Sequence, residues 1–102
     1  MESCIACSMP LSNSSDVGAR VDEGAVCIHC ATADGKMKSC EEIFEGGVQF
    51  FMGAVPGTER ALAERLTRKN MNMLAYWQKN KGACLNGEEA SEQEFEDAMS
   101  KL

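Results

Sequence analysis

Two Cys-x-x-Cys pairs near the N-terminus constrain this chain more than any other feature. Cys4 and Cys7 form the first pair and Cys27 and Cys30 the second, with nineteen residues between the two pairs. Two intervening residues allow both thiolates of one tight turn to reach the same ion, and two such turns complete the tetrahedral site that zinc prefers. The pattern therefore predicts one zinc ion per chain, with Cys4, Cys7, Cys27 and Cys30 as its ligands.

A site of four thiolates leaves no open position on the metal for water or substrate. We therefore expect the zinc to be structural and not catalytic. We find no carboxylate pair, catalytic triad or phosphate-binding loop in a setting that would support catalysis, which predicts that the protein is not an enzyme. Iron in a rubredoxin-like centre is the alternative metal, and it would make the chain a redox or metal-handling protein.

The small size of the N-terminal segment explains why it needs a metal. The first 36 of the 102 residues contain few large apolar side chains, so they cannot bury enough surface to fold without a staple. Binding of a structural zinc contributes on the order of 10 kcal/mol in zinc-finger peptides. We predict a metal-stabilised unit over residues 1–36, with short strands at 19–21 and 25–28, and a helical region over residues 37–102.

Start and stop signals predict the helices of the second region. A serine followed three residues later by a glutamate forms a capping box at Ser39–Glu42 and again at Ser91–Glu94. Pro56 and Gly57 end the first helix, and Gly82 ends the second. The predicted helices cover about 40–54, 58–81 and 91–101.

Apolar residues at helical spacing predict which faces of these helices are buried. The first helix is expected to bury Phe44, Val48, Phe51 and Val55, with Ile43, Phe50 and Met52 widening the stripe. The second is expected to bury Leu62, Leu66, Met73 and Trp77, with support from Met71 and Leu74. Gly46 and Gly47 interrupt the first helix at a cost of about 1 kcal/mol each relative to alanine, which suggests that another element approaches closely there.

Three further residues are candidates for chemistry outside the four-cysteine set. His29 lies between two predicted ligands; it is either an alternative ligand or proton relay or an exposed residue, and its position favours the latter. Cys40 lies in the first turn of a helix, where thiol pKa values are lowered, although an inert cysteine is the favoured interpretation. Cys84 lies in a glycine-rich turn and could be exposed. Either of these last two is also a possible spare ligand.

The charge distribution bears on the choice of partner. The chain carries a net charge of −6, which becomes about −8 when four thiolates hold one dication. Such a chain repels phosphate backbones unless a basic patch gathers on its surface. Residues 59–81 carry +4 and end near Tyr76 and Trp77, so they could contact nucleic acid. Residues 82–102 carry −5, and the preferred interpretation is that these two segments pair within the chain and that Trp77 anchors the core.

The position of the first pair also predicts where the protein works. A pair that begins at Cys4 leaves no room for a signal peptide before it, and no apolar run is long enough to span a membrane. We therefore expect a cytoplasmic protein, in which paired cysteines bind metal more often than they form disulfides.

Several motifs together resemble the zinc-ribbon domain family of small bacterial and archaeal proteins. They are Cys4–Cys7 followed by Ser8-Met9-Pro10-Leu11, Cys27–Cys30, Asp34-Gly35-Lys36, Glu41-Glu42-Ile43, and the run from Asn72 to Lys79 that contains Trp77. The resemblance covers roughly residues 2–80 and implies that Cys4, Cys7, Cys27 and Cys30 bind zinc. Ser8 departs from the usual glycine and Ala31 follows the second pair, and each is expected to strain a turn of positive φ by about 1 kcal/mol.

The sequence as a whole predicts a small metal-stabilised α+β protein, an N-terminal zinc ribbon followed by two or three helices. The favoured function is that of a non-catalytic zinc-binding module that mediates protein–protein interaction. A regulatory role is included in this interpretation. Nucleic-acid binding through the basic 59–81 segment and a redox or metal-handling role remain the alternatives.

Overall fold

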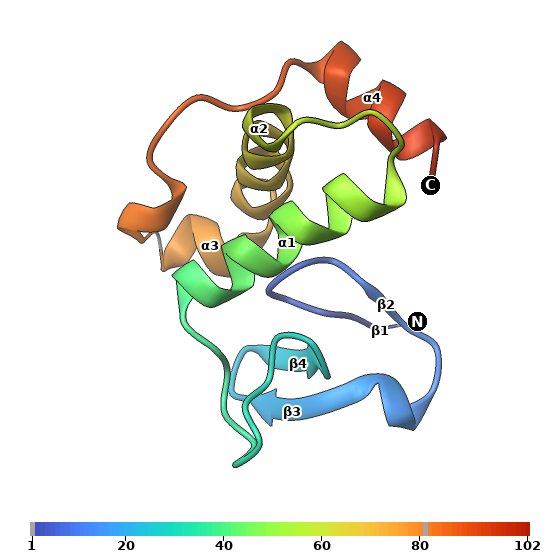
Figure 1. Cartoon of the computed structure of the whole chain (residues 1–102). Helices are drawn as coiled ribbons and strands as arrows, with labels where there is room; N and C mark the ends of the chain where they lie inside the picture. Colours follow the sequence, from blue (N-terminus) through green and yellow to red (C-terminus); the bar gives the residue numbers. More distant parts are fainter. Residues whose placement is uncertain (1, 81) are drawn as a thin grey trace.

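The computed structural model describes residues 2–80 and 82–102 and places a small β unit against a set of helices. Figure 1 shows the strands below and the helices above, with the first-pair loop rising between them. One buried cluster runs through both parts, since Val26 and Cys27 of the β unit share it with Met71 and Trp77 of the helices. The ribbon therefore packs directly on the helical region.

Two antiparallel hairpins make up the ribbon. Strands β1 (Glu2–Ser3) and β2 (Pro10–Leu11) flank the first Cys-x-x-Cys pair, and β3 (Val17–Val21) and β4 (Gly24–Cys27) lead into the second. A 3-10 turn, η1 (Ser14–Asp16), joins the hairpins. The two strands predicted at 19–21 and 25–28 correspond to β3 and β4. Such short strands bury little apolar area, which is consistent with the need for a metal staple.

Helices α1 (Cys40–Ala54) and α2 (Arg60–Asn72) form the main helical pair. Their contact explains one of the two glycines in α1, because a Cβ on Gly47 would lie only 2.6 Å from the Cγ2 atom of Thr67. Gly46 has open space around it. The predicted close approach of another element is thus confirmed at Gly47 and does not apply to Gly46.

Both predicted capping boxes are present. The Ser39 side chain accepts a hydrogen bond from the Glu42 amide at the start of α1, and Ser91 accepts one from Glu94 at the start of α4 (Glu92–Ser100). Each glutamate side chain in turn accepts from the amide of its serine. These local signals located the two helix starts correctly because they depend on residues only three positions apart.

The prediction of a single helix over residues 58–81 is wrong. The chain forms α2, breaks at Met73 and Leu74, and continues as the short helix α3 (Ala75–Lys79); Lys81 lies outside the described residues. Leu74 has an extended conformation (φ −85°, ψ 135°). The side-chain amide of Gln78 donates to the carbonyl of Asn72, which satisfies part of the freed helix end.

Three residues predicted to be buried lie at the surface. Met73 is 55% exposed because the break turns it away from the core, and Phe50 and Met52 are 54% and 38% exposed. The remaining stripe of α1 packs as expected, with Val48, Phe51 and Val55 buried against Ala63 and Leu66 of α2.

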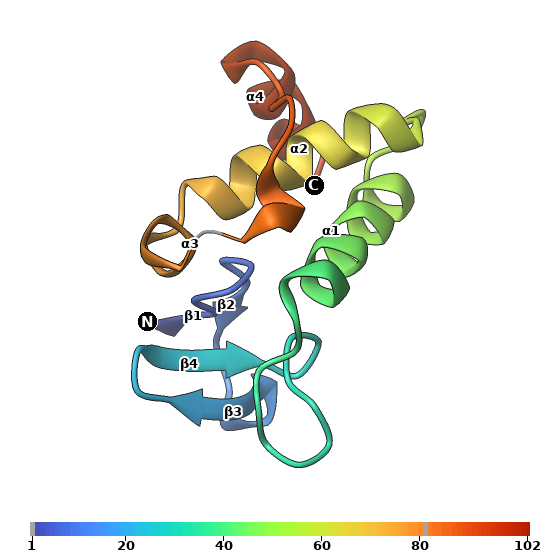
Figure 2. The same ribbon diagram turned by 90° about the vertical axis from the view of Figure 1, so that its left-hand side faces the viewer.

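The chain ends in an arm, residues 82–102, that runs back along α2. It contains a 3-10 turn, η2 (Ala83–Leu85), an extended stretch, and α4, which lies beside α2 at the far end from the ribbon (Figure 2). Leu85, Ala90 and Ala98 are its buried residues. Within residues 2–80 and 82–102, no helix combines the length and apolar character needed to cross a bilayer.

Candidate metal centre

The four predicted ligands converge on one point. Their sulfur atoms all lie within 4.8 Å of one another, and the Sγ atoms of Cys7 and Cys27 are 3.7 Å apart. Zinc–sulfur bonds of about 2.3 Å in a tetrahedron place the sulfurs about 3.8 Å apart, so the donor set fits such an ion. Cys4, Cys27 and Cys30 are buried and Cys7 is half-buried. The arrangement can hold one metal ion with all four positions filled by sulfur.

The first turn is shaped by backbone hydrogen bonds around Cys4. The Cys4 amide donates to the carbonyl of Met9 and the Ser8 amide donates to the carbonyl of Cys4, both at 2.8 Å. The Ala6 amide points at the Cys4 sulfur, 3.4 Å away. An amide directed at a thiolate stabilises its negative charge, so this turn is organised for a charged ligand.

The second turn is tied to its surroundings in a similar way. The Cys30 amide donates to the carbonyl of Cys27, and the Cys30 carbonyl accepts from the amide of Lys38. The hairpins are linked by the Ile5 amide, which donates to the carbonyl of Ala25. The two Cys-x-x-Cys turns are therefore held in register by backbone contacts in addition to any shared ion.

Two side chains from the helices clamp the first turn. The indole Nε1 of Trp77 donates to the carbonyl of Ala6 at 2.8 Å, and the Asn70 amide donates to the carbonyl of Cys7 at 3.1 Å. Trp77 is only 4% exposed, so the prediction that it anchors the core is confirmed. The sequence gives no signal for the hydrogen bond from Trp77 to Ala6 or for the one from Asn70 to Cys7. Each bond joins residues more than sixty positions apart.

Ser8 follows the first pair in a left-handed conformation, with φ of 69°. This confirms the strain expected from replacing the usual glycine. Its hydroxyl donates to the side-chain oxygen of Asn70, which offsets part of that strain. The matching expectation for Ala31 is wrong, since Ser8 is the only non-glycine residue with positive φ among residues 2–80 and 82–102.

Hydrogen bonding among the four sulfurs shifts their pKa values in opposite directions. The Cys30 thiol lowers the pKa of Cys27 to about 6, and Cys27 in turn lowers the pKa of Cys4. Hydrogen bonds with Cys27 raise the pKa of Cys7 and of Cys30. Shifts of opposite direction are expected where four ionisable sulfurs share one site, because adjacent negative charges repel one another. A divalent ion favours thiolate at all four positions, so its binding releases protons and weakens at low pH.

His29 lies at the surface of the second turn, and the metal-ligand cluster consists of the four cysteines alone among the described residues. Its exposed position agrees with the simpler of the two predictions.

Cys40 and Cys84 do not behave as the sequence predicts. The sequence pattern predicts a thiol at each position, with Cys40 buried or inert, whereas the structure joins the two in a disulfide across 44 positions. Both are half-buried. While this bond is intact, neither sulfur can serve as a spare ligand. Sequence alone could not reveal the pairing, because six cysteines allow many combinations and spacing does not choose among them.

The acidic arm pairs with the basic helix, as predicted. Arg65 of α2 forms an ion pair of 2.7 Å with Glu94 of α4, and Arg68 donates to the backbone carbonyl of Glu88. Arg60, the first residue of α2, also pairs with Glu45 of α1 at 2.6 Å and with Glu64 of α2 at 3.1 Å. The charges of Arg60 and Arg65 are therefore compensated within the molecule.

Comparison with known proteins agrees with this geometry. Curated proteins and solved structures give no significant match. The model of the family described as "Putative zinc ribbon domain" matches residues 3–78, which include all four clustered cysteines and both α2 and Trp77. Because the match spans about three quarters of the chain, from the first hairpin to α3, this protein belongs to that zinc-ribbon family.

Proposed function

We propose that the protein is a non-catalytic module in which one zinc ion, bound by Cys4, Cys7, Cys27 and Cys30, orders the ribbon for binding to a protein partner. The observation that carries this is the convergence of four sulfurs within 4.8 Å, with a 3.7 Å separation close to that of a tetrahedral thiolate site. A closed set of four ligands supports a structural ion. Reduced thiolates also suit the cytoplasm, the compartment we propose.

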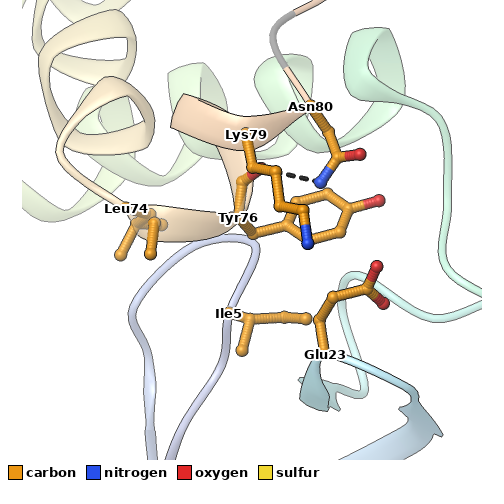
Figure 3. Close-up of a pocket in the computed structure, with 7 residues that line it drawn as sticks. Ile5, Glu23, Leu74, Tyr76, Lys79 and Asn80 are labelled. Atoms are coloured by element: carbon orange, nitrogen blue, oxygen red, sulfur yellow. Dashed lines mark hydrogen bonds between the residues drawn. The ribbon is translucent and has the colours of Figure 1, made fainter.

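A hollow beside the first turn is the surface that we assign to the partner. It has a volume of about 260 Å³ and lies where the first-pair loop, the β3–β4 turn and α3 meet (Figure 3). Ile5 and Leu74 give it an apolar floor, while Tyr76, Lys79 and Glu23 bring polar groups to its rim. An apolar pocket with a polar rim suits a single apolar side chain of a partner, flanked by charged residues.

Nucleic-acid binding is the weaker interpretation. Phosphate contacts require cations free to replace counterions, and Arg60 and Arg65 already make ion pairs with Glu45 and Glu94. The chain is also acidic overall, with a net charge of −6. Both facts favour a protein partner.

Metal content and ligand replacement test the zinc assignment. Purified protein is expected to be colourless and to contain one zinc per chain, whereas a coloured iron centre would support the rubredoxin alternative. Replacing Cys7 or Cys27 by serine should unfold the ribbon, residues 1–36, and leave α1 and α2 at least partly helical. Dispersed ribbon resonances in the NMR spectra of those variants would contradict the assignment.

An NMR titration tests the partner. Zinc-loaded protein is mixed with cell-extract fractions and, separately, with short DNA and RNA duplexes at low salt. We expect a fraction to shift Ile5, Leu74 and Tyr76, and we expect Lys79→Glu at the rim to remove the effect while Lys101→Glu, at the exposed C-terminus, retains it. Salt-sensitive shifts along α2 with the duplexes would instead support nucleic-acid binding.

A further inference from the structure

The six cysteines divide into two spatially separate groups with different chemistry. Four meet at the metal centre, and the other two, Cys40 and Cys84, form a disulfide whose Cα atoms are 6.1 Å apart. Cys40 is the first residue of α1 and Cys84 is the middle residue of η2. The bond therefore joins the start of the first helix to the start of the C-terminal arm.

Besides the disulfide, the arm, residues 82–102, is held by noncovalent contacts, which include the Asn72 side chain donating to Glu89 and the buried Ala98. Leu85 is buried, the Ala90 amide donates to the carbonyl of Arg65 at 3.0 Å, and Glu94 pairs with Arg65. The stretch between Leu85 and Ala90 is exposed. The covalent link to α1 holds the start of the arm at η2, before the exposed stretch, and so adds to these noncovalent contacts in limiting movement of the arm away from α2.

The arm covers a face of α2 that is basic and partly apolar. Arg68 lies 5.3 Å from the ring centre of Phe44 and donates to Glu88, while Lys69 lies 6.0 Å from the ring centre of Phe95. The Nε atom of Arg68 is buried without a hydrogen-bond partner among the described residues. Movement of the arm would uncover these cations and the apolar side chains beside them.

We propose that Cys40 and Cys84 form a reversible redox site, whose disulfide locks the acidic arm onto α2 and whose reduction by a thiol releases it. A thiolate of the reductant attacks the Sγ atom of Cys84 and displaces Cys40 as thiolate, giving a mixed disulfide. A second reductant thiol then resolves the mixed disulfide. Overall, two thiols of the reductant are oxidised to one disulfide. The Cys40–Cys84 bond is reduced to two protein thiols, which take up the two protons.

The positions of the two cysteines favour this direction of attack. Cys84 is half-buried and follows the exposed Ala83 in η2, from which side a small thiol can approach. Cys40 occupies the first position of a 15-residue helix, where the amide dipoles stabilise the negative charge of a leaving thiolate. A chain that keeps four thiolates for metal must work where thiols survive, and disulfides there are usually exchangeable.

The test uses the full zinc-loaded chain in buffers of oxidised or reduced glutathione. Cysteines are labelled with iodoacetamide and located by mass spectrometry, and amide hydrogen exchange is followed at Ala90. In the oxidised buffer we expect no labelling of Cys40 or Cys84. In the reduced buffer both should be labelled, the four metal-site cysteines should stay protected, and exchange at Ala90 should rise by about tenfold or more.

Two variants control for general loss of structure. Cys84→Ser should show fast exchange at Ala90 in both buffers, whereas Ala83→Ser, at the exposed neighbouring position, should respond as the unaltered chain does. Labelling of Cys40 and Cys84 in the oxidised buffer would contradict the disulfide. Resistance of the bond to reduced glutathione in the folded protein would contradict its reversibility. Reduction without faster exchange at Ala90 would overturn the lock. None of these outcomes depends on which partner binds the ribbon.

Discussion

Replacing Trp77 by phenylalanine tests whether the helices and the metal site form one cooperative unit. The indole nitrogen of Trp77 donates to the carbonyl of Ala6, which lies inside the first metal-binding turn. Phenylalanine keeps an aromatic ring in the same place but cannot donate. The substitution therefore removes one hydrogen bond between α3 and the ribbon with little other change of chemistry.

The structure sets the size of the effect. Ala6 is fully buried, so its carbonyl is left unpaired where water cannot reach it, which costs about 1–3 kcal/mol. The smaller ring leaves a gap that adds about 1 kcal/mol. We therefore expect the free energy of unfolding of the zinc-loaded protein to fall by about 2–4 kcal/mol. If the about 1–3 kcal/mol lost with the hydrogen bond acts on the metal-binding turn, the zinc affinity falls by about fivefold to 150-fold.

Two measurements separate these contributions. Urea unfolding of the zinc-loaded protein gives the change in stability, and competition with a chromophoric chelator gives the change in zinc affinity. Phe51→Leu is the matched control, because Phe51 is equally buried but belongs to the α1–α2 core away from the ribbon. It should lower stability and leave the zinc affinity unchanged.

An unchanged zinc affinity in Trp77→Phe, with stability lowered as in the control, would refute the coupling. The ribbon would then fold around its metal independently of the helices, and the hydrogen bond to Ala6 would only fix their relative orientation.

Three further predictions follow from single contacts. Ser8→Ala should be less stable than Ser8→Gly by about 1 kcal/mol in urea unfolding, because both lose the hydroxyl but only glycine relieves the positive φ; equal stabilities would argue against strain there. Gly46→Ala should stabilise α1 by about 1 kcal/mol, whereas Gly47→Ala should destabilise it by about 1–3 kcal/mol through a clash with α2, measured by thermal unfolding; the same sign for both would contradict the packing. Arg60 lowers the pKa of Glu45 from its usual 4.5 to about 2, so their ion pair stabilises the fold above about pH 4.5 and is lost as the pH falls through 2; NMR titration of Glu45 should show this pKa rising in Arg60→Gln, and no rise would exclude the pair.

Features that depend on neighbouring residues were predictable from the sequence. The spacing of the Cys-x-x-Cys pairs identified the four residues that the fold brings together, because two residues between cysteines fix a local turn. The serine–glutamate capping boxes located the starts of α1 and α4 for the same reason. The strain at Ser8 also followed from a single turn, since left-handed backbone is costly for any residue with a side chain.

Features that depend on distant residues were not predictable. The Cys40–Cys84 bond and the Asn70 contact with the first turn both join segments more than forty positions apart. The exposure of Phe50 shows the same limit, because helical spacing defines an apolar stripe but not the width of the partner surface that covers it. Tertiary packing determines these outcomes, and no local pattern encodes it.

The break between α2 and α3 was also missed, yet it accounts for how the helices reach the metal site. Asn70 and Trp77 are seven positions apart, so an uninterrupted helix would separate their Cα atoms by about 10.5 Å along its axis. Their acceptors, the carbonyls of Ala6 and Cys7, belong to consecutive residues whose Cα atoms are only about 3.8 Å apart.

Turning the chain at Leu74 removes this mismatch, because α3 no longer continues the axis of α2 and instead lies over the first-pair loop (Figure 2). The helix end that the turn exposes is partly satisfied by the side chain of Gln78, which donates to the carbonyl of Asn72. Neither proline nor glycine lies at the break, and the hydrogen bonds of Asn70 and Trp77 to the first Cys-x-x-Cys turn contribute to its stability. The ribbon thus shapes the helices as much as the helices support the ribbon, and a metal ion held by the four cysteines would stabilise both.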